Sequence, residues 1–145
     1  MNIFLKLLVI ILIIFLNSCS KKEEKILMIQ EKELRLQMID AYKEGVKALE
    51  AGDVLFAAKK FNESEILFPQ SEWASKSILM AAYSYYTQDY YYDAIVELER
   101  FIKKYPKDER LNYAHFLLAI CYYEQIVDEK KDLEPLMNAQ KEFEF

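Results

Sequence analysis

Residues 45–69 read GVKALEAGDVLFAAKKFNESEILFP, and residues 82–106 read AYSYYTQDYYYDAIVELERFIKKYP. The two stretches align without a gap. Each begins with a small residue, has an alanine twelve positions later and a bulky apolar residue four positions after that, and closes with a proline. Their offset is 37 residues, the distance from Gly45 to Ala82. Self-similarity with a period of about 20–50 residues is typical of repeat proteins.

Within each stretch, the spacing predicts two helices that pack closely. The small residues let the helices approach each other, the bulky apolar residue fills the space between neighbouring repeats, and proline ends the second helix because it lacks a backbone N–H. The predicted packing positions are Gly45, Ala57, Phe61 and Pro69, then Ala82, Ala94, Leu98 and Pro106, and Ala119 in a third copy. Gly52-Asp53 supplies the first turn, and Gln88-Asp89 leaves the second turn less certain.

The third copy departs from this spacing. Ala139 and Phe143 restore the alanine and aromatic pair, but the charged residues 124–135 predict a longer loop before them. The pattern resembles the tetratricopeptide repeat, which implies an all-α solenoid of about two and a half to three repeats. We place the repeats at residues 38–71, 75–108 and 112–145, the last one incomplete, and expect the sequence to be a C-terminally truncated fragment.

The N-terminus predicts export and a lipid anchor. Lys6 precedes a short apolar run at residues 7–16, as in a secretory signal peptide. The run ends in Leu16-Asn17-Ser18-Cys19, which resembles a bacterial lipobox and implies acylation of Cys19. We therefore expect a signal peptide at 1–18, a lipidated tether at 19–25 and the repeat domain at 26–145. The alternative is an unmodified cysteine beside an uncleaved anchor.

Composition argues against several functions. The net charge of −5 and the lack of a basic stripe disfavour nucleic-acid binding. Only two glycines are present, so no phosphate-binding loop is expected. No Cys/His cluster has metal-ligand spacing, His115 stands alone, and Cys121 lies in an apolar helical stretch as a predicted core residue. We expect no enzyme activity, no metal and no cofactor.

Several blocks resemble the BamD family, also called YfiO or ComL. They are Pro69-Gln-Ser-Glu-Trp-Ala74, Leu79-Met-Ala-Ala-Tyr83, Ala94-Ile95, Arg100-Phe-Ile102, Tyr105-Pro106 and Tyr122-Tyr-Glu-Gln-Ile-Val-Asp128. The resemblance implies a lipid-anchored subunit of the outer-membrane β-barrel assembly machine, at the periplasmic face of the outer membrane. Its implied partners are the barrel subunit, companion lipoproteins and unfolded outer-membrane proteins. Lys131-Asp132-Leu133 departs from the family pattern.

Helical spacing also predicts a partner-binding groove. Aromatic and apolar residues recur on one face of the first helix of each repeat. The predicted groove residues are Tyr42, Leu79, Tyr83, Tyr86, Tyr113, Phe116 and Tyr123. The resemblance implies the C-terminal β-signal of unfolded outer-membrane proteins as ligand. Two alternatives stay open: the aromatic rows are only core, or the chain is another periplasmic tetratricopeptide lipoprotein, such as a pilus secretin pilot or an envelope-constriction coordinator.

Overall fold

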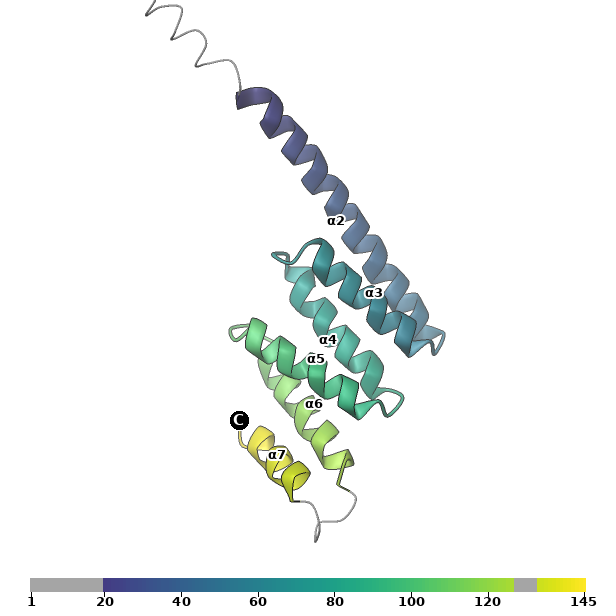
Figure 1. The fold of residues 1–145 in the computed structure, drawn as a ribbon, viewed down its shortest axis with the longest axis vertical. Helices are drawn as coiled ribbons and strands as arrows, with labels where there is room; N and C mark the ends of the chain where they lie inside the picture. Colours follow the sequence, from purple (N-terminus) through teal and green to yellow (C-terminus); the bar gives the residue numbers. More distant parts are fainter. Residues whose placement is uncertain (1–19, 127–132) are drawn as a thin grey trace, which may run out of the picture. The chain divides into compact units, whose positions relative to one another are not determined.

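A computed structural model describes residues 20–126 and 133–145, with side chains from Met28 onward. The described residues form helices and contain no strand (Figure 1). The helices are α2 (Ser20–Glu50), α3 (Val54–Leu67), α4 (Glu72–Tyr86), α5 (Tyr91–Lys104), α6 (Leu111–Glu124) and α7 (Glu134–Phe143). None of these described helices combines the length and the apolar character needed to cross a bilayer. The predicted all-α fold class is confirmed.

The chain divides into two units, one up to Leu34 and one from Arg35 to Phe145. α2 passes through both, so only its residues from Arg35 belong to the larger unit. The helix begins at Ser20, whereas the sequence predicted a tether up to residue 25 and helix from about Ile26. The predicted signal peptide and Cys19 lie outside the described residues.

In the larger unit, consecutive helices pack as antiparallel hairpins (Figure 1). Hydrogen bonds and ring contacts place α2, α4 and α6 in one row and α3 and α5 in a second. α7 packs on α6. One core cluster is built from α2, α3 and α4, and the other from α4, α5 and α6.

Most of the predicted packing positions lie in these cores. Six of them have no exposed surface: Ala57, Phe61, Ala82, Ala94, Leu98 and Ala119. A Cβ atom added to Gly45 would lie 2.9 Å from the Phe61 ring, so only glycine allows the helices to approach this closely here. Pro69 and Pro106 are exposed, and each follows the last residue of its helix by two positions. Cys121 is fully buried, and burial raises the pKa of its thiol to about 12.

The turns of the first two repeats share one backbone conformation. Gly52 has a φ of 80°, and Asp89, which stands 37 residues later, has a φ of 63°. The Gln88 Nε2 donates to the Gly52 carbonyl oxygen at 2.9 Å and so links the two turns. Asp53 then caps α3 by accepting a hydrogen bond from the Phe56 amide at 3.1 Å. The turn that the sequence left uncertain therefore matches the first one.

Gly52→Ala should destabilise the unit by about 1 kcal/mol, because an L side chain is strained at positive φ. Crowding is not the reason, since the nearest atom to an added Cβ is the Gln88 amide nitrogen at 3.8 Å. Urea unfolding followed by the fluorescence of Trp73, the chain's single tryptophan, measures the change. Gly52→Asn should cost less, because asparagine tolerates this conformation as Asp89 does. Equal stability of Gly52→Ala and wild type would contradict this account.

The third repeat is looser than the first two. α6 ends at Glu124 and α7 begins at Glu134, within the predicted longer loop, of which residues 127–132 lie outside the described part. Ala139 is buried, but Phe143, in the place of Phe61 and Leu98, is 53% exposed. It makes an edge contact with Phe116, with ring centroids 6.4 Å apart.

A polar network connects α3 to α5; we call it the α3–α5 staple. Its members are Asn62, Glu65, Glu97, Arg100 and Lys104. The Glu65 carboxylate is 2% exposed and accepts hydrogen bonds from Arg100, at 2.6 Å, and from Lys104. Arg100 also donates to Glu97 and to the Asn62 side-chain oxygen, both at 2.6 Å. The buried carboxylate is thus fully paired, as burial of a charge requires.

Candidate binding face on α4 and α6

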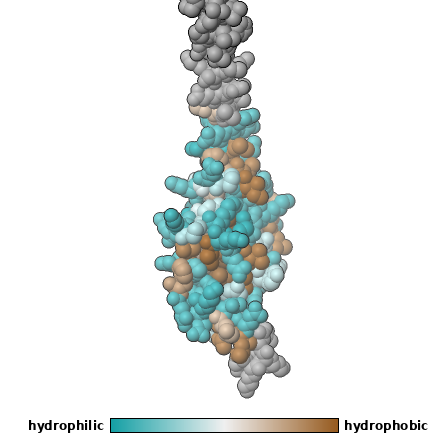
Figure 2. Space-filling model, turned by 60° about the vertical axis from the view of Figure 1, so that its left-hand side comes forward, coloured by the Kyte–Doolittle hydropathy of each residue, from teal (hydrophilic) through white to brown (hydrophobic). Residues whose placement is uncertain are grey.

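The row of α2, α4 and α6 presents an aromatic surface, which we call the aromatic face. Its exposed members on α4, on the turn after α4 and on α6 are Tyr83, Tyr90, Tyr113, Phe116 and Tyr123. On α6 the spacing of Tyr113, Phe116 and Tyr123 follows the helical period, so these side chains leave the helix on one side. Large exposed aromatic groups grouped in this way are typical of interaction surfaces. The space-filling view in Figure 2 shows apolar surface (brown) interspersed among hydrophilic residues.

The tyrosines of α4 and α6 lie close together. Tyr83 and Tyr86 have ring centroids 6.4 Å apart, and Tyr86 lies 6.2 Å from Tyr91. Burial raises the pKa of Tyr113, and the neighbouring Tyr83 and Tyr86 raise it further. The Tyr113 phenol therefore stays protonated at neutral pH. Each tyrosine ring offers an apolar body with a hydroxyl at its tip.

The other predicted groove residues differ in exposure. Tyr42 and Leu79 are buried, at 8% and 7% exposure, and both belong to core clusters. Tyr42 contacts the Phe61 and Trp73 rings edge-on at 5.2 and 5.0 Å. Tyr86 is half-buried and packs on the α4–α6 core. These three are packing residues in the structure, and the accessible aromatic surface comes from the remaining four predicted residues and Tyr90.

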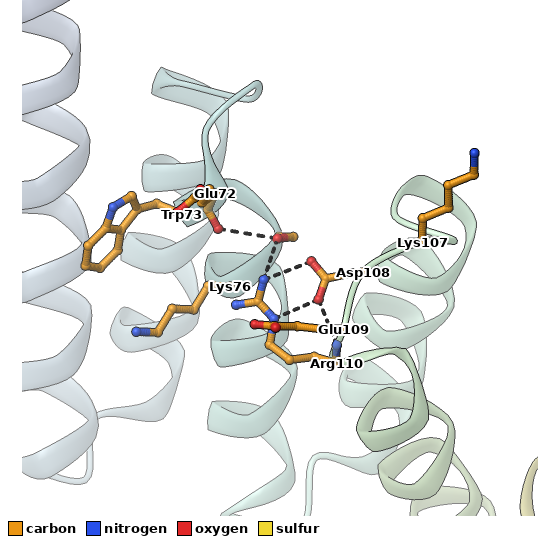
Figure 3. Close-up of a pocket in the computed structure, with 8 residues that line it drawn as sticks. Glu72, Trp73, Lys76, Lys107, Asp108, Glu109 and Arg110 are labelled. Carbon is orange, nitrogen blue, oxygen red and sulfur yellow. Dashed lines mark hydrogen bonds and ion pairs between the residues drawn. The ribbon is translucent and has the colours of Figure 1, made fainter.

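A pocket of about 580 Å³ lies at the N-terminal ends of α4 and α6 (Figure 3). Trp73 forms one wall, and the Lys76 ammonium lies 5.0 Å from its ring centroid and 5.3 Å from that of Tyr42. Lys107 and Glu109 also line the pocket from the segment that joins α5 to α6. An indole beside an ammonium group can bind ligands with both apolar and anionic parts.

Arg110 is fixed within this pocket. Its guanidinium donates to Asp108 at 2.7 and 2.8 Å and to the Ser75 hydroxyl at 3.0 Å (Figure 3). Hydrogen bonds from Arg110 lower the pKa of Asp108 to about 2. The pair therefore stays charged and connects the start of α6 to α4, while Arg110 contributes little free positive charge to a ligand.

This pocket was not predicted from the sequence. Trp73 was noted only within the block at residues 69–74 that resembles the BamD family, and no role was predicted for Lys76 or Arg110. The sequence did carry a signal for it: Trp73, Lys76 and Leu79 have helical spacing, so they extend the line of predicted groove residues on α4 toward the N-terminus of this helix. The position of Arg110 depends on the path of the chain after Pro106, and no pattern in the sequence predicts that path.

The single histidine, His115 on α6, packs against the C-terminal segment. The His115 Nδ1 lies 2.5 Å from the Glu142 carboxylate, and its ring stacks on Phe145 with centroids 3.6 Å apart. Among the residues that the structure describes, no group of three or more His, Cys, Asp or Glu side chains is arranged to hold a metal ion.

Comparison with known proteins identifies relatives of the repeat domain. Residues 35–145 match the family model YfiO, described as an outer membrane lipoprotein. The chain is 38% identical over 115 residues to outer membrane protein assembly factor BamD of Caulobacter vibrioides, an alignment that covers 79% of this chain and 37% of that protein. BamD of Rickettsia prowazekii is 28% identical over 141 residues, covering 96% and 54% respectively.

A third relative, BamD of Neisseria gonorrhoeae, is 30% identical over 84 residues, covering 58% of this chain and 32% of that protein. The chain thus spans about half or less of the length of the curated relatives it matches. The family match covers the whole larger unit, including α4, α6 and the Trp73 pocket. The chain therefore belongs to the YfiO family of outer membrane lipoproteins.

Proposed function

We propose that this chain is a lipid-anchored adaptor in the assembly of outer-membrane proteins. In this proposal Cys19 carries the lipid at the periplasmic face of the outer membrane. The repeat domain binds the barrel subunit, companion lipoproteins and unfolded outer-membrane proteins, and it promotes their folding and insertion without enzymatic chemistry. The relatives are named as outer membrane protein assembly factors, and the family as outer membrane lipoproteins, which supports this assignment.

The observation that carries the proposal is the aromatic face. Tyr83, Tyr113, Phe116 and Tyr123 leave large apolar side chains at the surface of two helices that are otherwise well packed. Tyrosine is enriched at interfaces because it buries a large area at a small cost in side-chain entropy. A segment with alternating aromatic residues, such as the β-signal of an unfolded barrel protein, could place its rings among these side chains.

The proposal predicts that Tyr83→Ala/Tyr123→Ala weakens the binding of a β-signal peptide about tenfold or more, because central aromatic residues carry much of the energy of an interface. Calorimetric titration of the chain without residues 1–19 measures the affinity. Both side chains are exposed, at 37% and 59%, so their truncation should leave the fold intact.

Tyr92→Ala is the matched control. Tyr92 is 74% exposed on α5, in the other row of helices, and should not affect the titration. Equal affinities of the wild type, the double variant and this control would remove the aromatic face as the binding site.

A further inference from the structure

The two joints of the solenoid differ in how their helices are connected. The first joint lies between the α2–α3 and α4–α5 repeats, and the second between the α4–α5 and α6–α7 repeats. At the first joint, the staple links α3 directly to α5 through the buried Glu65 carboxylate. The corresponding helices at the second joint are α5 and α7.

The two residues at the centre of the staple, Glu65 and Arg100, have apolar counterparts at the second joint. By the 37-residue offset between α3 and α5, Ile102 stands in the place of Glu65. By the 45-residue offset from Ala94 to Ala139, Phe145 stands in the place of Arg100 and Glu142 in the place of Glu97. An isoleucine and a phenylalanine cannot form the ion pair that joins α3 to α5. Glu142 contacts His115 of α6 instead.

A pocket of about 540 Å³ occupies this position at the second joint. It is lined from α5 by Glu99, Ile102 and Lys103, and from α7 by Asn138 and Lys141. Tyr122 of α6 donates to Glu99 at 2.7 Å, so the polar contacts here connect α6 to its neighbours on either side. The second joint is thus held by the apolar core between α5 and α6, by this Tyr122–Glu99 hydrogen bond and by the Arg110–Ser75 hydrogen bond at the start of α6, with no ion pair among these contacts.

We propose that the second joint is a hinge and that the first joint is locked by the staple. In a solenoid, each repeat contacts only its neighbours, so an interface without directional ion pairs can rotate independently of one that has them. Rotation about the packed α5–α6 core changes the gap between α5 and α7. On the opposite side it changes the separation of α4 and α6, which carry Tyr83 and Tyr113. The hinge therefore adjusts the width of the aromatic face. This link to ligand binding rests on the proposed function, whereas the difference between the joints does not.

Distance measurements at equivalent positions test the hinge. Lys59, Val96 and Lys141 are exposed and occupy the same place on α3, α5 and α7. Spin labels at Lys59→Cys/Val96→Cys report the first joint, and labels at Val96→Cys/Lys141→Cys report the second. The full chain is used in detergent, with Cys19→Ser and Cys121→Ala removing the native thiols. The distance distribution at the second joint should be about twofold broader than at the first. Equal widths would overturn the proposal.

Exchanging the staple residues between the two joints gives a second, independent test of the hinge. Ile102→Glu/Phe145→Arg, which supplies the missing pair beside the native Glu142, should narrow the second distribution to the width of the first. Ile102→Gln/Phe145→Met is the uncharged control and should leave it broad. Conversely, Glu65→Ile/Arg100→Phe should broaden the distribution at the first joint, because it removes the directional contacts that fix α3 against α5, even though an apolar pair keeps most of the free energy of unfolding. If a folded Glu65→Ile/Arg100→Phe chain keeps its narrow distribution, the staple is not the lock and the proposal fails.

A β-signal peptide added to the labelled chain separates this proposal from the proposed function. Narrowing of the second distribution on peptide binding supports both. A broad second distribution without any peptide binding supports the hinge and removes the peptide as ligand. Peptide binding with two equally narrow distributions supports the proposed function and overturns the hinge.

Discussion

Replacing Phe61 with alanine is expected to destabilise the repeat domain by about 3–5 kcal/mol, because a buried phenylalanine leaves a large cavity when it is truncated. Phe61 has no exposed surface and contacts Tyr42, and its ring lies 2.9 Å from the position of a Cβ added to Gly45. The site cannot collapse easily on the side of Gly45, because this residue has no side chain that could move into the cavity. Urea unfolding monitored by circular dichroism measures the loss.

Phe56→Ala is the control for this substitution. Phe56 lies on the same helix but is 42% exposed, so its truncation should cost less than about 1 kcal/mol. Phe61→Leu should fall between the two, because it keeps most of the apolar volume. A loss at Phe61→Ala no larger than at Phe56→Ala would show that the first helix pair is not held through this ring.

Arg100→Met is expected to cost about 2–3 kcal/mol, because it leaves the buried Glu65 carboxylate with Lys104 as its remaining cation. The full effect of an uncompensated buried charge is larger, but Lys104 stays in place and Arg100 is itself partly solvated. Glu65→Leu/Arg100→Met should recover most of the loss, since an apolar pair of similar volume needs no partner. Urea unfolding of the three chains measures this, and a loss below about 0.5 kcal/mol for Arg100→Met would contradict the role of the staple.

The same substitution changes the dependence of stability on pH. Burial alone would raise the pKa of Glu65, but hydrogen bonds from Lys104 and Arg100 outweigh it and lower the pKa below its ordinary value of 4.5. A carboxyl whose pKa is lowered on folding stabilises the fold above its unfolded pKa, and this contribution is lost as the pH falls through the folded pKa. The difference in the free energy of unfolding between the wild type and Arg100→Met should therefore have its full size at pH 7. It should become smaller below pH 4.5.

The repeat pattern predicted the helical part of the fold well, because its determinants are local. Pro69 and Pro106 end helices wherever they occur, and small residues such as Ala82 mark close helix contacts whatever the partner. The start of α2 at Ser20 was missed, because charged residues after Cys19 suit a tether as well as a helix. The turn at Gln88-Asp89 was left less certain from the sequence, because aspartate adopts positive φ less often than glycine.

The accessible part of the aromatic face was predictable only in outline. Helical spacing placed Leu79 and Tyr83 on one face of α4, and Tyr123 on the corresponding face of α6. Spacing alone does not tell which of these side chains a neighbouring helix covers. Leu79 is shorter than tyrosine and lies beneath the surface, in the α4–α6 core. The staple and the Trp73 pocket join residues 35 or more positions apart, so their contacts depend on the stacking of repeats.

The burial of Cys121 also bears on how such a domain would fare in an oxidising compartment. Thiol–disulfide exchange proceeds through the thiolate, and a thiol with a pKa near 12 supplies almost none at neutral pH. Its position in the core, among Ala114, Leu117 and Leu118, also keeps oxidants and foreign thiols away from the sulfur. Once folded, the domain therefore keeps this cysteine reduced through packing alone, with no second cysteine needed to protect it.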